Sequence, residues 1–161
     1  MSPRRKKQLL IVLLLLTYVL VGFFRESVFV HLNEQRRVIY NLVYRHLLPD
    51  SPVPQPQWIW RFDYFQLTRA KWILTLLFTI IFALMAAATV RVAFNNKSFV
   101  RLTLLIYAGV FLAGWLVYLL GSFSGLSEEL YDVSRFLAGL VETPAMLAIL
   151  CAAFLAMQLK R

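Results

Sequence analysis

Four long apolar runs constrain this chain more than any other feature of its sequence. They read Leu9–Phe24, Trp72–Phe94, Leu102–Phe123 and Phe136–Leu159. A helix rises about 1.5 Å per residue, so each run is long enough, or nearly so, to cross a hydrocarbon core of about 30 Å. We therefore expect an all-α membrane protein with four transmembrane helices, at about 8–24, 72–94, 102–123 and 136–159.

The composition leaves room for one membrane domain over residues 1–161 and for no soluble catalytic domain. Hydrophobic residues make up 60% of the chain, and the one substantial polar segment covers residues 25–71. A net charge of +9 would suggest nucleic acid as the partner of a soluble protein. Here the basic residues gather at the ends of the apolar runs, which membrane orientation explains better. We therefore expect membrane lipid, and no nucleic acid, as a partner.

The N-terminus has the look of a secretory signal, because the basic residues Arg4 to Lys7 precede a leucine-rich run. A cleavable signal ends in small residues near its cleavage site. This run ends instead in Gly22-Phe23-Phe24-Arg25, so we interpret it as a retained first span. Its apolar part covers only about 24 Å. Lys7 and Arg25 are therefore expected to snorkel to the two membrane surfaces.

The distribution of basic residues predicts that both termini are cytoplasmic. Basic residues flank the runs at the N-terminus, between the second and third runs, and at the C-terminus. The short loop before the fourth run is mainly acidic. Because short basic flanks stay on the cytoplasmic side, residues 25–71 are expected to be extracytoplasmic. The expected location is the cytoplasmic (inner) membrane of a bacterium, with a multi-pass topology.

The polar segment 25–71 divides into three parts. Apolar residues in Glu26–Leu48 recur close to a helical period, which predicts an amphipathic helix lying along the outer membrane surface or docking on a partner. Four prolines follow between positions 49 and 56 and favour extended polyproline geometry. An aromatic and basic stretch then precedes the second run and is typical of an interfacial belt. Its expected anchors are Trp58, Trp60, Arg61, Tyr64 and Trp72.

A Glu-x-Pro motif, Glu142 to Pro144, lies inside the fourth apolar run. A charged carboxylate at this depth costs about 2–3 kcal/mol or more, so it should face protein or water. Arg135 lies about 20° away on the helical wheel and is long enough to reach toward it. Pro144 removes the hydrogen bond to the carbonyl of Leu140 and is expected to kink the span. Glu142 either relays protons, binds a cation or grips a substrate, or it fixes helix packing through a polar contact.

Small residues in the third and fourth runs predict close approach between helices. In the fourth run they lie on one face of the wheel with Glu142, which is therefore expected to point into a seam between helices. In the third run a Gly-x-x-x-Ala motif predicts the same kind of contact. The predicted packing residues are Ala138, Ala145, Ala148, Ala152, Ala156, Gly109 and Ala113.

The remaining residues with reactive side chains predict no chemistry. Cys151 lies on the opposite side of the wheel from Glu142, with no polar neighbour in sequence to activate its thiol. His31 and His46 belong to the expected surface helix and are too few for a metal site. No phosphate-binding loop, Ser/His/Asp pattern or metalloprotease motif is found. We therefore expect no catalytic residue, no metal and no cofactor.

The order of these parts is similar to that of a known family. A short first span leads through Phe24-Arg25-Glu26 into an outer amphipathic segment, and the fourth span opens with Arg135-Phe136-Leu137 before Pro144. In these features the chain resembles the small exosortase-associated multi-pass membrane proteins. The resemblance covers most of the chain in hydropathy and length. It implies an accessory role in a bacterial protein-sorting or envelope-export system and assigns no activity to the protein itself.

Three functions are compatible with this pattern. The first is a non-enzymatic accessory or scaffold subunit that binds a larger membrane protein, such as a sorting peptidase. The second is a small ion-coupled transporter or channel subunit, a homo-oligomer in which Glu142 is the coupling acid, Pro144 the hinge and Arg135 the counter-charge. The third is an intramembrane enzyme using Glu142, Arg135 and a loop histidine, and the scarcity of polar groups within the spans speaks against it.

Overall fold

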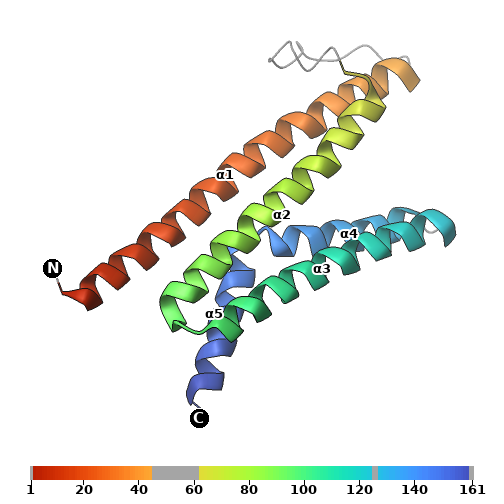
Figure 1. Cartoon of the computed structure of the whole chain (residues 1–161). Coiled ribbons are helices and arrows are strands. Elements are labelled where there is room, and N and C mark those ends of the chain that lie inside the picture. Colours follow the sequence, from red (N-terminus) through yellow and green to blue (C-terminus); the bar gives the residue numbers. More distant parts are fainter. Residues whose placement is uncertain (1, 45–61, 125–126, 160–161) are drawn as a thin grey trace. The chain divides into compact units, whose positions relative to one another are not determined.

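The computed structural model of the chain describes residues 2–44, 62–124 and 127–159. Over those residues it is all-helical, as predicted, with five helices and no strand (Figure 1). Three of these helices are long and apolar enough to cross a membrane, and a bent helix pair adds a fourth candidate span if it counts as one. The helices are α1 (Pro3–Tyr44), α2 (Tyr64–Phe94), α3 (Lys97–Ser124), α4 (Ser127–Val141) and α5 (Pro144–Leu159).

These helices form two compact units, which are described separately. The first unit comprises Met1–Gly22 and Phe78–Arg161, and the second comprises Phe23–Leu77. The first unit therefore holds the beginning of α1, the end of α2 and all of α3, α4 and α5. The second unit holds the end of α1 and the beginning of α2.

The first helix does not end where the hydropathy falls. We expected a span ending near Phe24 and a separate surface helix from Glu26, but α1 runs without a break through both segments, so that prediction is wrong. Within α1, Gly22 is the one glycine, and this helix contains no proline after Pro3. Since charged residues do not stop a helix, nothing in this sequence terminates α1 near Phe24. The predicted helical period is present as far as Tyr44, and residues 45–48 lie outside the described chain.

The second helix begins earlier than its apolar run, because a capping box lies ahead of that run. Asp63 Oδ1 accepts a hydrogen bond from the backbone N–H of Gln66 at 2.8 Å. In return, Gln66 Oε1 accepts one from the backbone N–H of Asp63 at 3.0 Å. This reciprocal pair satisfies two donors of the first turn and starts α2 at Tyr64 rather than at Trp72.

Two asparagines make the connection between α2 and α3. Asn95 has a φ of 50°, the left-handed conformation that asparagine tolerates at a helix end. Its N–H donates to the carbonyl of Arg91 at 3.0 Å. Asn96 Oδ1 then accepts from the N–H of Ser98 at 2.9 Å and caps α3. The chain therefore reverses within two residues.

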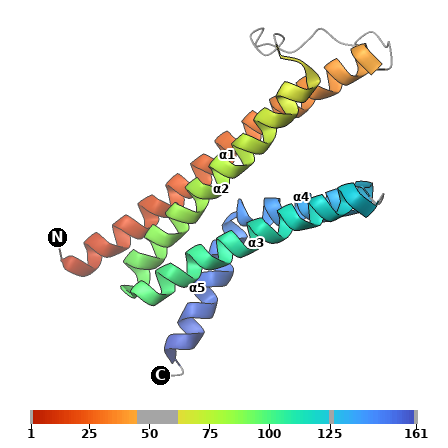
Figure 2. The same cartoon turned by 45° about the vertical axis from the view of Figure 1, so that its right-hand side comes forward.

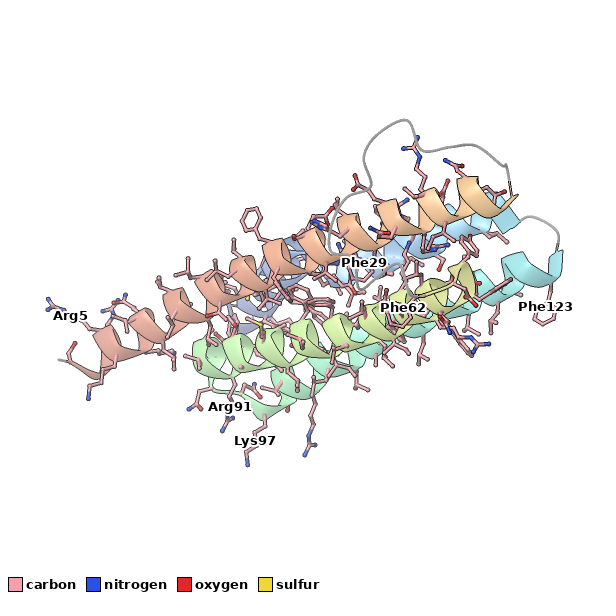
Figure 3. The ribbon with its side chains drawn as sticks, turned by 90° about the horizontal axis from the view of Figure 1, so that it is seen from above. Arg5, Phe29, Phe62, Arg91, Lys97 and Phe123 are labelled. Atoms are coloured by element: carbon pink, nitrogen blue, oxygen red, sulfur yellow. The ribbon has the colours of Figure 1, made fainter. Side chains whose placement is uncertain are left out.

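Basic residues surround this connection in the first unit. Lys7 Nζ donates to the carbonyl of Ala93, in the last turn of α2, at 2.8 Å. A cation there satisfies an orphan carbonyl and complements the helix dipole. Figure 3 shows Arg91 and Lys97 close to the same turn. The beginning of α1 and the α2–α3 connection therefore share one basic end of the first unit.

The fourth apolar run forms two helices rather than one. α4 and α5 are separated at Glu142 and Thr143 and are bent by 62°. The predicted kink is thus confirmed, and it amounts to a complete break. Pro144 has no N–H for the carbonyl of Leu140, which accepts instead from Thr143 Oγ1 at 2.8 Å and from Thr143 N at 3.3 Å. Proline then occupies the first position of α5, where its missing donor costs nothing.

Close packing joins α3 to α4, which lie side by side in Figures 1 and 2. The contact is centred on Gly114, where an added Cβ would lie 3.4 Å from Leu137 Cβ and 3.5 Å from the carbonyl oxygen of Ser134. Ser134 is buried and Ala138 is half-buried beside it. A small residue on α3 therefore faces a small-x-x-x-small pair on α4, which allows the two backbones to approach closely.

An aromatic cluster holds α5 against the α2–α3 connection. The rings of Phe99 and Phe154 stack with their centroids 4.5 Å apart and their planes 3° apart. Phe94 packs edge-on against both rings, with centroids at 5.7 and 5.9 Å. Such pairs add about 0.5–1.5 kcal/mol each beyond the area that they bury.

The second unit is an antiparallel helical hairpin. Leu32 of α1 and Leu67 of α2 form its buried core, with Ile39 and Leu74 packed against it. Polar contacts flank this seam, because Lys71 Nζ donates to Asn33 Oδ1 at 3.0 Å. Arg36 Nη2 donates to Tyr64 Oη at 3.1 Å, and the Arg36 guanidinium lies 5.1 Å from the centre of the Tyr64 ring. The Tyr40 ring packs against the same ring, with the two centroids 5.8 Å apart.

Candidate functional site

The first unit encloses a cluster of polar side chains from four of its segments. Tyr18 comes from α1, Thr79 from α2, Tyr107 from α3, and Glu142 from the break between α4 and α5. Their exposed fractions are 1%, 5%, 1% and 3%, respectively. A buried polar group costs free energy unless it is hydrogen-bonded, so the contacts within this cluster decide what it can do. We call these four residues the Glu142 cluster.

Helical periodicity places these side chains inside. On α2 the buried positions Phe78, Phe82 and Ala86 recur every four residues, and Thr79 lies on the same stripe. On α3 the buried positions Phe99, Thr103 and Tyr107 have the same spacing. Thr79 and Tyr107 therefore occupy core positions of their helices.

Thr79 makes a contact that other buried threonines do not make. Thr75, Thr89 and Thr103 each donate to the carbonyl four residues earlier in their own helix, at 2.8–3.0 Å. Thr79 Oγ1 instead donates to Glu142 Oε1 at 3.2 Å. A threonine in a span ordinarily satisfies its hydroxyl locally, so the Thr79 bond is a specific contact between α2 and the helix break.

The two tyrosines connect the break to α1 and α3. Tyr18 Oη lies 3.0 Å from Tyr107 Oη and donates to the carbonyl of Thr143 at 3.2 Å. A phenol has one proton, so when Tyr18 donates to Thr143, Tyr107 must be the donor to Tyr18. The Tyr18 ring also packs against Phe82, with centroids 4.8 Å apart. The backbone next to Glu142 is thus held by a directed chain of hydroxyls.

All the polar atoms that meet in this cluster are oxygens. The cluster offers one carboxyl group, hydroxyls and one backbone carbonyl, so it can hold protons through hydrogen bonds or accept a hard cation. It contains neither an imidazole nor an amine. Within the described ranges, no group of three or more His, Cys, Asp or Glu residues could hold a metal ion. Cys151 on α5 is half-buried.

The structure separates the polar residues that the sequence grouped together. Glu142 is buried between helices, in the position that was predicted for it. Arg135 is exposed on α4, and among the described contacts it forms no ion pair with Glu142. Arg25 belongs to the second unit, where it pairs with Glu26 at 3.1 Å and lies 4.7 Å from the centre of the Phe29 ring. The hydrogen bond described for Glu142 therefore comes from Thr79 and not from Arg135.

The break also changes the predicted stripe of small residues. Ala138 on α4 is half-buried, but Ala145, Ala148, Ala152 and Ala156 on α5 are exposed. The buried face of α5 consists of Met146, Leu147, Leu150 and Phe154. A wheel drawn through one continuous helix loses its phase at a 62° bend, so the alanines of α5 do not line the seam with Glu142. In α3, Gly109 and Ala113 are exposed as well, and Gly114 makes the close contact instead.

Three of the predicted membrane anchors, Trp58, Trp60 and Arg61, lie outside the described residues. Tyr64 and Trp72 are half-buried in the second unit. His31 is exposed, and its Nδ1 lies 2.7 Å from the carbonyl of Ser27 in the same helix. The sequence analysis did not single out Tyr18 and Thr79. The available signal was their hydroxyl groups inside apolar runs, where a polar group needs a hydrogen-bond partner.

Comparisons with protein-family models, with curated proteins and with solved structures find no match for this chain. The resemblance to the exosortase-associated proteins therefore stays a prediction that rests on Arg25, Arg135, Phe136 and Pro144. In the structure, Arg25 belongs to the second unit and the other three belong to the first.

Proposed function

We propose that this protein is a non-enzymatic accessory subunit of a bacterial protein-sorting or envelope-export system, bound to a larger membrane protein such as a sorting peptidase. Both termini are cytoplasmic in this proposal, and the second unit lies at or beyond the outer surface of the cytoplasmic membrane. The basic end of the first unit supports that orientation, because basic flanks stay in the cytoplasm.

The observation that carries the proposal is the length of α1. A helix from Pro3 to Tyr44 is about 63 Å long, roughly twice the hydrocarbon thickness. The excess is not a loose extension, since residues 23–44 pack against 64–77 through an apolar seam and polar contacts. A preformed helical hairpin attached to membrane spans supplies a rigid docking surface, and it is unnecessary in a protein that only crosses the membrane.

The outward side of this hairpin is suited to protein contact. It carries exposed aromatic and aliphatic side chains together with exposed arginines, and aromatic residues and arginine are enriched in protein interfaces. Tyrosine and arginine are among the residue types that dominate interface energies, and phenylalanine is enriched in interfaces. The exposed residues of this kind are Val30, Arg37, Tyr40, Phe62, Phe65 and Arg69.

Affinity purification of the tagged protein from native membranes, with mass spectrometry of stoichiometric partners, tests the proposal. We expect a larger membrane protein to co-elute with the wild type and to be reduced at least tenfold by the double substitution Tyr40→Ser and Phe65→Ser. Phe123→Ser is the control, because Phe123 is more exposed than Tyr40 and Phe65 but lies in the first unit. Recovery of a pure homo-oligomer, or equal loss in the control, would refute docking through the hairpin.

The Glu142 cluster favours a second candidate, a small ion-coupled transporter or channel subunit. An acid buried where a membrane helix breaks is the arrangement that many transporters use for their coupling ion. In this candidate Glu142→Gln abolishes transport in reconstituted vesicles while partner binding and folding persist. In the accessory proposal the same substitution leaves partner recovery unchanged.

A further inference from the structure

We propose that the Glu142 cluster is an intramembrane proton-binding site and that its proton occupancy sets the bend between α4 and α5. The inference does not depend on the accessory role. It would supply the coupling step of the transporter candidate, but it holds for either function.

The groups in the cluster favour a proton over a metal ion. The three contacts in the cluster measure 3.0, 3.2 and 3.2 Å, which are hydrogen-bond distances. Each of these contacts already holds a hydroxyl proton. The cluster has one carboxyl group, and among the described residues no group of three or more His, Cys, Asp or Glu side chains could hold a metal ion. A bound proton resides on one carboxyl oxygen of Glu142 and needs no further ligand.

The connections of Glu142 couple its charge to the helix break. Its side chain is held by Thr79 of α2, and the carbonyl of the next residue, Thr143, is held by Tyr18 of α1. Tyr107 of α3 in turn holds Tyr18. The break is therefore tied to three helices through hydroxyls, and the bond at Glu142 is the one whose acceptor can change charge.

Thr79 provides the two alternative states. A hydrogen bond to a carboxylate is about twice as strong as one to a neutral acceptor, so ionised Glu142 holds the Thr79 hydroxyl. When Glu142 takes up a proton from water, the carboxyl becomes neutral and this bond weakens. Thr79 can then donate to the carbonyl one turn earlier in α2, as Thr89 and Thr103 do in their helices. The break is then released from α2, and a different bend becomes favourable.

Among the described residues, few other groups near Glu142 can change charge. The titratable side chains that the neighbouring helices bring to this region are Tyr18, Tyr107 and Cys151, while Arg91 and Arg135 are exposed. A carboxyl group ionises well before a phenol or a thiol as the pH rises. A response of the bend to moderate pH therefore belongs to Glu142.

Infrared titration of the full chain in lipid vesicles tests proton binding. We expect a buried carboxyl band whose intensity falls as the pH rises, and we expect Glu142→Gln to remove it completely. Glu34→Gln is the matched control, because Glu34 is an exposed carboxyl of the second unit, and it should leave that band unchanged. A wild-type spectrum without such a band, or a band that survives Glu142→Gln, would overturn the proposal.

Distance measurements by electron paramagnetic resonance test the coupling to the bend. Spin labels at Phe136→Cys on α4 and Met157→Cys on α5, with Cys151→Ser, report the bend from two exposed positions. The distance should change with pH, and Glu142→Gln should abolish that change. If Glu142→Gln does not fold, Thr79→Val serves instead and should move the midpoint to higher pH by about one unit. If the distance between the two spin labels does not change with pH, or if it changes with added sodium at constant pH, a proton switch is excluded.

Discussion

The two compact units both join α1 to α2, but they place their polar contacts differently. In the second unit, the polar contacts of Arg36, Tyr64 and Lys71 flank a small apolar seam, and these side chains are only half-buried. In the first unit, Tyr18, Thr79, Tyr107 and Glu142 are buried in the core. Polar contacts that remain near water can be exchanged for water, whereas buried ones must be made within the protein. The first unit therefore depends on its buried hydroxyls, whereas these polar contacts of the second unit can be replaced by water. Gln35 and Thr75 are buried polar residues of the second unit.

The largest effect should come from the close contact between α3 and α4. Gly114→Leu forces a side chain into Leu137 and the carbonyl of Ser134, and should destabilise the protein by about 3 kcal/mol or more. Gly109→Leu is the control, since nothing lies within 4 Å of a Cβ added there. Unfolding in mixed micelles with increasing denaturing detergent measures both. Equal tolerance of the two leucines would show that α3 and α4 do not pack at Gly114.

The same chemical change in each unit tests the comparison directly. Tyr18→Phe removes a buried hydroxyl and leaves Tyr107 and the carbonyl of Thr143 short of a partner, so it should cost about 1–2 kcal/mol. Tyr64→Phe removes a half-buried hydroxyl whose partner Arg36 can turn to water, and it should cost less than about 0.5 kcal/mol. The same unfolding assay compares them. A larger loss of unfolding free energy in Tyr64→Phe than in Tyr18→Phe would contradict the conclusion that the first unit depends more on its hydroxyls.

The capping box offers a local test of the hairpin. Asp63→Ala removes the acceptor at the start of α2 and should destabilise the second unit by about 1 kcal/mol. Asp63→Asn retains a capping oxygen and should restore most of that loss. Hydrogen exchange of the amides in the first turn of α2 reports the effect. Unchanged protection in Asp63→Ala would mean that the cap does not set the start of the helix.

The smallest effect on stability is expected from the exposed alanines of α5. Ala148→Leu should change the free energy of unfolding by less than about 0.5 kcal/mol, because no intramolecular contact is lost. If this face binds a partner, the same substitution reduces co-purification through a steric clash. Normal recovery of the partner with Ala148→Leu and with Ala152→Leu would remove α5 from the interface.

Local patterns predicted the helices better than they predicted where the helices end. The fall in hydropathy after Phe24 suggested a break, yet a helix stops for want of hydrogen bonds or room, and α1 meets neither obstacle there. Asp63 with Gln66, by contrast, is a start signal that lies outside the apolar run and can be read from sequence alone. Pro144 was a reliable signal for a kink in the fourth apolar run. The sequence did not give the 62° size of the bend, or the hydrogen bond from Thr143 to the carbonyl of Leu140.

The sequence by itself determined that the protein is all-helical and rich in candidate membrane spans, because hydropathy and helical period are local properties of the chain. It also identified Glu142 as a residue that should face protein or water, with Arg135 as its expected polar partner, since a charged carboxyl inside an apolar run is costly. Only the tertiary structure decided that this partner is Thr79 rather than Arg135, and that Tyr18 and Tyr107 join the same cluster. Those choices depend on which helices lie together and on the phase change at the 62° break, and neither is encoded in a single helical wheel.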